Sequence, residues 1–142
     1  MVEGGQVIRI DEQAARDMAR QAEAAYPEEC CGALLGRDGE SREVARSVPA
    51  PNTTGETRTR RYLIAPETVR DLERTAEADG LQVVGYYHSH PDHPARPSET
   101  DERLAWPWYS YVIVPVSAGV VGAPRAWRLR DDRTGFDEQE IA

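Results

Sequence analysis

The most informative segment of this chain is His88-Ser89-His90-Pro91-Asp92-His93-Pro94-Ala95-Arg96-Pro97-Ser98-Glu99-Thr100-Asp101. It begins at the end of an expected strand, where residues two apart project from the same face, so the imidazoles of His88 and His90 point the same way. Asp101 supplies a carboxylate from the first turn of the next helix. Two imidazoles and one carboxylate are a common ligand set for catalytic zinc and leave the fourth position for water. These three residues therefore predict a zinc site.

The C-terminal part of the segment has a second interpretation. Ser98 followed three residues later by Asp101 is typical of a helix N-cap, and the tetrapeptide alone favours capping. A loop stiffened by three prolines joins it to His-x-His, and this connection favours the metal site. Both roles are compatible, because a residue in the first helical turn can face a metal. His93, in the same loop, is expected to be exposed and to take no part.

Length and charge limit the classes of partner. With 142 residues, the chain is expected to form one domain over 1–142. It carries 17 basic residues, all of them arginine, against 25 acidic ones, for a net charge of −8. Such an acidic surface argues against binding to nucleic acid or to an anionic membrane.

The compartment is expected to be the cytoplasm. No apolar run reaches the ~18 residues of a membrane span, and we expect no signal peptide. Cys30 and Cys31 are adjacent, a spacing that bridges only with strain, and no CxxC motif is present. We expect both cysteines to be small buried hydrophobes.

Periodicity and turn residues predict the remaining elements. Expected strands are 6–10, 30–35, 42–49, 62–64, 81–88, 109–116 and 126–130; expected helices are 12–25 with Asp11 as N-cap, 66–79, and one from Ser98 to before Pro107. The acidic tail 131–142 is expected to be an edge segment or partly disordered. The aromatic residues at 106–111 are expected to pack in the core. This irregular order of elements predicts a mixed sheet in an α/β fold.

The polar loop 51–61 contains the one basic cluster, formed by Arg58, Arg60 and Arg61. A solvated loop is the simpler interpretation. Because loops carry function disproportionately, a docking surface for a substrate tail is the alternative.

The spacing of the functional residues resembles that of a known family. His-x-His, seven residues, Ser, two residues and Asp is the motif of the JAMM (MPN-plus) zinc metalloproteases, and His88, His90, Ser98 and Asp101 match its positions. Bacterial members carry an upstream Glu in a segment similar to Pro27-Glu28-Glu29-Cys30-Cys31-Gly32-Ala33-Leu34-Leu35-Gly36. The register of that segment assigns the family's general acid/base to Glu29.

The resemblance implies a fold and an activity. The fold would be cytidine-deaminase-like, a curved, mixed and mostly antiparallel sheet flanked by helices. The activity would be zinc-dependent hydrolysis of peptide or isopeptide bonds after the C-terminal Gly-Gly of small ubiquitin-like sulfur carriers of the ThiS or MoaD type. Such a carrier, or its C-terminal adduct, is the expected partner, and a homodimer is left open.

The residues themselves agree with this chemistry. Strand alternation puts Glu29 and Cys31 on one face and Glu28 and Cys30 on the other. Glu29 would move a proton from water to the leaving amine, and the Ser98 hydroxyl would donate to the oxyanion.

Two other classes of protein share features with this sequence. A non-catalytic MPN scaffold that binds partner proteins typically lacks one or more ligands, whereas this chain retains the set. A zinc deaminase needs His-x-Glu and Pro-Cys-x-x-Cys elements, and the sequence contains neither.

Overall fold

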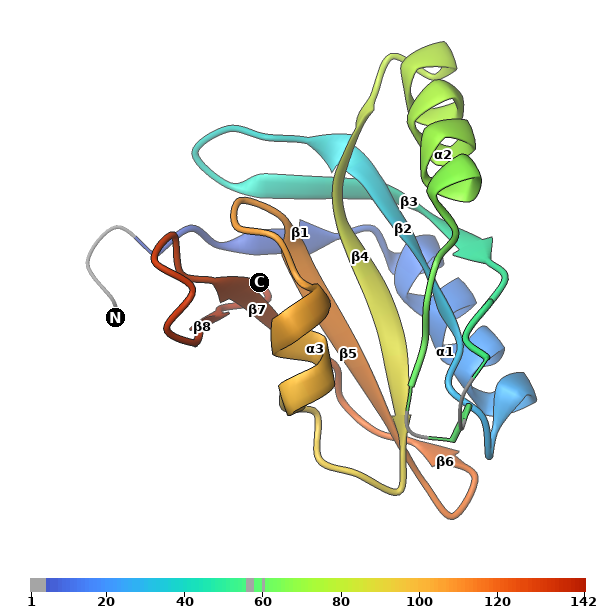
Figure 1. The fold of residues 1–142 in the computed structure, drawn as a ribbon. Helices are drawn as coiled ribbons and strands as arrows, with labels where there is room; N and C mark the ends of the chain where they lie inside the picture. The colour runs from blue at the N-terminus through green and yellow to red at the C-terminus, as the bar shows by residue number, and fades with distance from the viewer. Residues whose placement is uncertain (1–4, 56–57, 60) are drawn as a thin grey trace.

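The computed structural model describes residues 5–55, 58–59 and 61–142. The chain alternates irregularly between strands and helices (Figure 1). The elements in order are β1 (Ile8–Ile10), α1 (Glu12–Ala25), β2 (Cys31–Arg37), β3 (Arg42–Ala50), α2 (Pro66–Ala78), β4 (Gln82–Pro91), α3 (Glu99–Leu104), β5 (Ser110–Ser117), β6 (Val120–Val121), β7 (Arg125–Leu129) and β8 (Phe136–Gln139).

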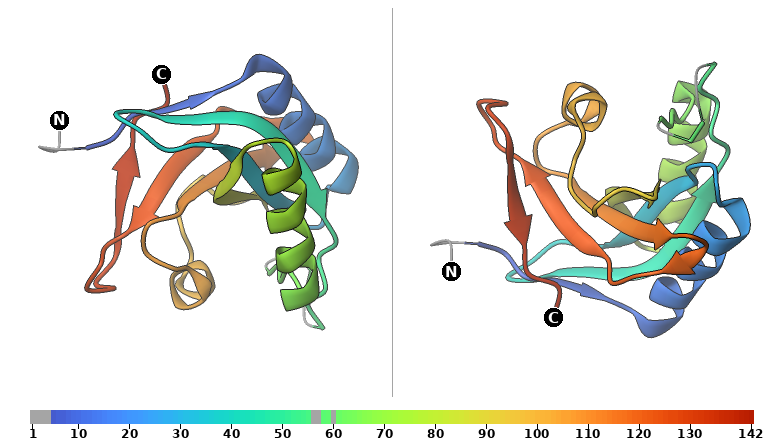
Figure 2. Two further views of the ribbon diagram at one scale, coloured as in Figure 1. Left: turned by 90° about the horizontal axis from the view of Figure 1, so that it is seen from above. Right: turned by 90° about the horizontal axis from the view of Figure 1, so that it is seen from below.

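The strands form one mixed sheet with the order β1-β3-β2-β4-β5-β7-β8, and β6 pairs with β5. Two neighbouring pairs, β1–β3 and β4–β5, are parallel, and the other pairings are antiparallel. Figure 2 shows that the sheet curls until its two ends approach each other, and a bridge between Ile8 and Ile141 joins them. The expectation of a curved, mixed and mostly antiparallel sheet is confirmed.

Helices cover both faces of the sheet (Figure 2). The Asp11 carboxylate caps α1 as predicted, accepting from the backbone N–H groups of Gln13 and Ala14. Ala14, Met18 and Ala22, four residues apart, pack against one face. On the other face α2 buries Leu72 and Ala76. The α2 side is also the side of α3, and it carries the functional residues.

Strand β4 is longer than predicted and includes both histidines of the motif. Its parallel pairing with β5 requires a crossover, and α3 lies in that crossover. Gly85 is needed where β4 meets β5, because a Cβ there would lie 1.9 Å from the backbone oxygen of Ser110.

Two expectations differ from the structure. Residues 62–64 are not a strand: only Leu63 pairs, bonding to the backbone of Thr53 and the side chain of Asn52, so no ladder forms. Trp106 is exposed rather than in the core. The tail, by contrast, forms the edge segment that was one of its two expected states, since β8 pairs with β7 at the end of the strand order.

A fully buried arginine links the strands near the closure of the sheet. Arg42 donates from Nη1 to the oxygen of Val84 (3.2 Å) and to Ser110 Oγ (3.1 Å), while its Nε pairs with Asp38 at 3.1 Å. Its guanidinium also lies 4.2 Å from the ring centroid of Trp108. Such a buried charge is tolerated because Nε and Nη1 are hydrogen-bonded and Asp38 supplies a counter-charge.

Within the described residues, no helix combines the length and the apolar character needed to cross a membrane.

Candidate metal centre

The structure brings the three predicted ligands together. Nε2 of His88, Nε2 of His90 and Oδ2 of Asp101 lie 3.0 to 3.1 Å from one another. Both imidazoles are buried. They project from the same face of β4, as predicted, and Asp101 reaches them from the third position of α3.

These three atoms fit a small divalent cation. Nitrogen and oxygen ligands about 2.0 Å from a tetrahedral ion are about 3.3 Å apart, close to the separations seen here. Among the described residues this is the group of histidine, cysteine and carboxylate side chains that could hold a metal ion. Two imidazole nitrogens and a carboxylate oxygen form a donor set typical of zinc.

The loop after β4 sets the orientation of His90. Its Nδ1 is 2.8 Å from the backbone oxygen of Pro94, a bond in which Nδ1–H donates and Nε2 keeps its lone pair for a metal. Trp127 in β7 holds the neighbouring carbonyl, donating from Nε1 to Ala95 at 2.9 Å. At the start of the loop, Asp92 accepts from the Tyr26 hydroxyl at 2.8 Å. The loop is thus fixed at both ends.

The ring of Tyr62 stacks on His88, with centroids 4.4 Å apart and planes 22° from parallel. Burial raises the pKa of Tyr62 well above its ordinary value, so its hydroxyl stays neutral. Neither this contact nor the Pro94 bond follows from the motif spacing, because both depend on how separate segments pack.

Glu29 lies beside the ligands and is 4% exposed, while Glu28 faces solvent. Of the two adjacent acids, Glu29 is thus the one that faces the candidate ligands, and its role as the base stays a prediction. Desolvation raises the pKa of Glu29 to about 7, and the nearby charges of His88 and His90 oppose that rise only in part. Within the described part of the chain, Glu29 Oε1 is buried and has no hydrogen-bond partner. A buried carboxyl with a free oxygen is suited to accept a proton from water.

Ser98 and Asp101 form the predicted capping box. Ser98 Oγ accepts from the Asp101 N–H at 3.1 Å, and Asp101 Oδ2 accepts from the Ser98 N–H at 2.9 Å. The same Oδ2 faces the histidines, so capping and ligation coexist in one carboxylate. Burial opposes ionisation of Asp101, but the charges and hydrogen bonds of His88 and His90 prevail and hold its pKa well below its ordinary value.

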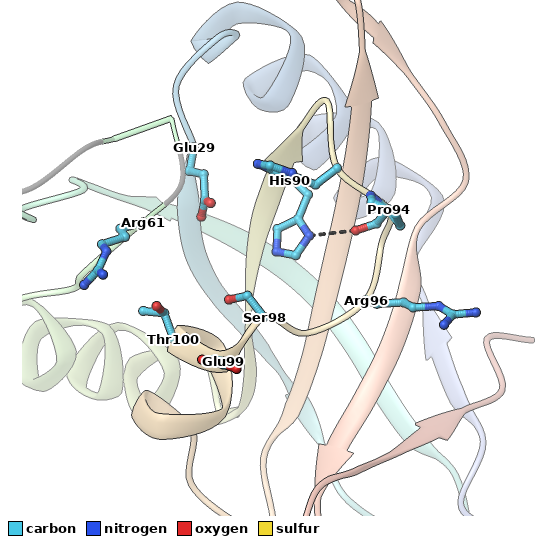
Figure 3. Close-up of a pocket in the computed structure, with 9 residues that line it drawn as sticks. Glu29, Arg61, His90, Pro94, Arg96, Ser98, Glu99 and Thr100 are labelled. Carbon is cyan, nitrogen blue, oxygen red and sulfur yellow. Dashed lines mark hydrogen bonds between the residues drawn. The ribbon is translucent and has the colours of Figure 1, made fainter.

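The candidate metal centre borders a cleft of about 410 Å³, which is lined by the candidate ligand His90, by Glu29 and by Ser98 among others. Figure 3 shows these three side chains pointing toward one another, with Arg61 across the cleft and Arg96 directed away from it. Exposed His93 also lines the cleft.

Part of the arginine cluster lies near this cleft. Arg61 lines it, and the backbone oxygen of Arg58 accepts from the Glu29 N–H at 2.6 Å. Arg60 lies outside the described residues. Docking of a substrate tail on the cluster stays a prediction.

Cys31 opens β2 and Cys30 directly precedes it, and the two side chains face opposite sides of the sheet, as predicted. Cys30 belongs to the core under α1 and Cys31 to the core under α2. Both are free and buried. Desolvation raises the pKa of both thiols, that of Cys31 to about 12, so neither is a ready nucleophile.

Known proteins resemble this chain along most of its length. A desampylase from Haloferax volcanii is 44% identical over 88 residues, which are 61% of this chain and 62% of that protein. The chain thus matches less than two thirds of that relative. A CysO-cysteine peptidase from Mycobacterium tuberculosis is 37% identical over 126 residues, which are 88% of this chain and 83% of the peptidase.

The fold has solved counterparts as well. The solution structure of a protein from Desulfitobacterium hafniense superimposes with a TM-score of 0.81 at 33% identity, covering 95% of this chain and 91% of that one. The family model described as prokaryotic homologs of the JAB domain matches residues 11–130, from the N-cap of α1 to the residue that follows β7. The chain therefore belongs to the prokaryotic homologs of the JAB domain.

Proposed function

We propose that this protein is a zinc-dependent hydrolase of peptide or isopeptide bonds, with His88, His90 and Asp101 as the metal ligands. One observation carries the proposal: the three ligand atoms converge within 3.1 Å beside the buried carboxyl of Glu29, whose Oε1 has no hydrogen-bond partner among the described residues. A site with only a structural role does not require a buried carboxyl without a hydrogen-bond partner beside it.

Each residue has a distinct part in the reaction. A zinc ion at the three ligands would polarise the scissile carbonyl and lower the pKa of water to about 7. Glu29 accepts a proton from the attacking water and returns it to the leaving amine, so it ends the cycle in its starting state. The Ser98 hydroxyl lines the same cleft and donates to the oxygen of the attacked carbonyl as negative charge develops on it.

The proposed substrate is a small ubiquitin-like sulfur carrier that is extended or conjugated at its C-terminal Gly-Gly. The motif resemblance supports this class, and so does the similarity to a CysO-cysteine peptidase and to a desampylase. Glycines suit the cleft, because they carry no side chain to clash beside the buried ligands. We place the reaction in the cytoplasm, and a homodimer stays a prediction.

Cleavage of carrier fusions tests the activity. A ThiS- or MoaD-type carrier with extra residues after Gly-Gly is incubated with the protein, and mass spectrometry identifies the new C terminus. We expect release directly after the second glycine. A matched carrier with a bulky residue in place of the penultimate glycine should bind but resist cleavage. Equal cleavage of both carriers, or of unrelated unfolded peptides, contradicts the proposed specificity.

Metal analysis tests the ligands separately. The purified protein should hold one zinc per chain, and the double variant His88→Ala, His90→Ala should hold none, because one carboxylate alone binds zinc weakly. His93→Ala is the matched control, since it removes an exposed histidine of the same loop. Full zinc content in the double variant would remove the assignment.

A further inference from the structure

The two histidines of the candidate metal centre are held in different ways. Nδ1 of His90 lies 2.8 Å from the backbone oxygen of Pro94, but Nδ1 of His88 is buried and has no hydrogen-bond partner among the described residues. A neutral histidine that offers Nε2 to a metal carries its proton on Nδ1, and an acceptor for that proton normally fixes the orientation of the ring. Within the described part of the chain His88 lacks such an acceptor, so the orientation of its ring depends on packing.

Tyr62 supplies this packing. Its ring lies almost parallel to that of His88, with a centroid distance of 4.4 Å, whereas the neighbouring ring of His90 is tilted by 58°. If the imidazole turned about its Cβ–Cγ bond, its edge would collide with the tyrosine ring, so the stack keeps Nε2 directed toward the other two ligand atoms. Tyr62 is itself packed against the apolar cluster under α2, which includes Cys31 and Leu72. The stack therefore connects a candidate ligand to the core of the molecule.

The Asn52 side chain fixes the backbone on both sides of Tyr62. Nδ2 donates to the backbone oxygen of Arg61 at 2.9 Å, and Oδ1 accepts from the Leu63 N–H at the same distance. The same Nδ2 also donates to the backbone oxygen of Glu29 at 3.3 Å. One half-buried amide thus joins the segment that carries Tyr62 to the residue proposed as the base.

We propose that Tyr62 is the positioning residue of His88 and that Asn52 acts through Tyr62, so that zinc affinity depends on two residues outside the His-x-His motif. The stack takes the place of the hydrogen bond that orients His90. Neither residue is a ligand: Tyr62 sets the direction of one ligand, and Asn52 sets the position of Tyr62. This inference rests on the proposed metal site and deepens it, adding two residues from the segment between β3 and α2.

Zinc affinity tests the role of Tyr62 without turnover. Metal-free variants compete for zinc with a chromophoric chelator, and the competition gives the Kd of each variant. Tyr62→Phe keeps the ring and should bind zinc as tightly as the parent protein. Tyr62→Leu keeps apolar volume but has no ring, and its Kd should rise about tenfold, as expected when a residue that orients a ligand is lost.

Tyr109→Leu is the matched control for loss of a tyrosine ring. Tyr109 is also half-buried, and its ring contacts are with Tyr86 and Trp108 rather than with a candidate ligand. This substitution should leave the Kd for zinc unchanged. Melting temperatures of all variants show whether a change in Kd merely follows a loss of stability.

A double-mutant cycle tests whether Asn52 acts through Tyr62. Asn52→Ala should raise the Kd for zinc about threefold in the parent protein. In the Tyr62→Leu background the same substitution should leave the Kd nearly unchanged, because the hydrogen bonds of Asn52 then hold no stacked ring. Equal effects in the two backgrounds would show that Asn52 does not act through Tyr62.

NMR of the metal-free protein gives a second readout that does not depend on zinc. The ring current of a stacked aromatic side chain shifts the carbon-bound imidazole protons of His88 upfield. We expect this shift in the parent protein and in Tyr62→Phe, and its loss in Tyr62→Leu. An unchanged shift in Tyr62→Leu, or zinc bound by that variant as tightly as by Tyr62→Phe, overturns the positioning role.

The two measurements also separate this inference from the proposed function. Zinc binding and carrier cleavage by the parent protein, with one Kd for all Tyr62 variants, leave the proposed function standing and reject the positioning role. A parent protein that shows the upfield shift but binds no zinc rejects the proposed function and leaves Tyr62 as the residue that orients His88.

Discussion

At the scale of single residues, the environment of Glu29 distinguishes it from its neighbour. The two adjacent acids differ only in the direction of their side chains, yet Glu29 is buried beside the ligands and Glu28 is exposed. Desolvation raises the pKa of Glu29 to about 7, a range in which a carboxyl can both take and give a proton near neutral pH.

Exchange of each acid for its amide tests this difference. Glu29→Gln should reduce kcat by about 100-fold or more, because it removes the base, while zinc stays bound because Glu29 is not a ligand. Glu28→Gln should keep most of the activity. Steady-state kinetics and metal analysis of the two variants provide the comparison, and a reversed pattern would assign the base to Glu28.

The same carboxyl should make the stability of the metal-free protein depend on pH. A carboxyl whose pKa is raised on folding stabilises the fold while it is protonated, and this contribution is lost as pH rises through about 7. The side chain in Glu29→Gln cannot ionise, so this variant does not lose stability in that way as pH rises. At about 1.4 kcal/mol per pKa unit, the rise from 4.5 to about 7 sets the upper limit of the difference at about 3.5 kcal/mol.

We therefore expect metal-free Glu29→Gln to melt several degrees above the metal-free parent at pH 8, and the gap to be much smaller at pH 5. Calorimetry at both pH values measures this. The same gap at the two pH values would show that ionisation of Glu29 is not its cause.

At the scale of elements, α3 combines two tasks in six residues. Its N-cap Ser98 satisfies a backbone donor of the first turn, and its third residue Asp101 both closes the capping box and faces the histidines. The strand before it ends in a loop whose carbonyl orients His90. The metal site therefore depends on how one strand end and one helix start are placed.

Substitutions at Ser98 separate its capping role from its proposed catalytic role. Glycine at an N-cap costs only a few tenths of a kcal/mol but has no hydroxyl. Ser98→Gly should therefore keep the zinc and nearly all stability, while kcat falls about 100-fold through loss of the oxyanion donor. Ser98→Thr retains the hydroxyl and should stay active. A Ser98→Gly enzyme with wild-type kcat would leave Ser98 as a cap only.

At the scale of the whole molecule, the C-terminal residues close the curled sheet. Buried Gln139 accepts from Ser110 Oγ at 2.6 Å and donates to the backbone of Gln6 at 3.2 Å. Backbone bonds of 2.9 and 3.0 Å join Ile8 to residues 140 and 142. Ser110 also accepts from the buried Arg42, so the tail is part of the same network as the core arginine.

Removal of residues 136–142 should destabilise the protein strongly. The deletion breaks the pairing of β7 with β8 and leaves buried groups unpaired, at about 1 kcal/mol for each hydrogen bond lost. We expect the melting temperature to fall by about 10 °C or more. Glu140→Ala is the control, since that side chain is exposed and only its backbone oxygen bonds to Ile8. A truncated protein as stable as the parent would show that the closure is dispensable.

The sequence by itself predicted the helices and most strands of this protein, and it singled out the three residues that converge in the structure as candidate metal ligands. His88 and His90 lie in one strand and Ser98 to Asp101 in one turn, so local backbone geometry places them and spacing is sufficient to find them. In the same way, the alternation of side chains along an extended chain predicted that Glu29 and Glu28 face opposite sides.

Tertiary structure alone decided the features that depend on distant segments: the stacking of Tyr62 on His88, the network around Arg42, the closure by β8 and the exposure of Trp106. Tyr62 stands in a segment that looks like a strand, but it has no ladder, because pairing depends on what lies alongside. Burial and contact between remote residues come from packing the whole chain, and no short window of sequence contains that information.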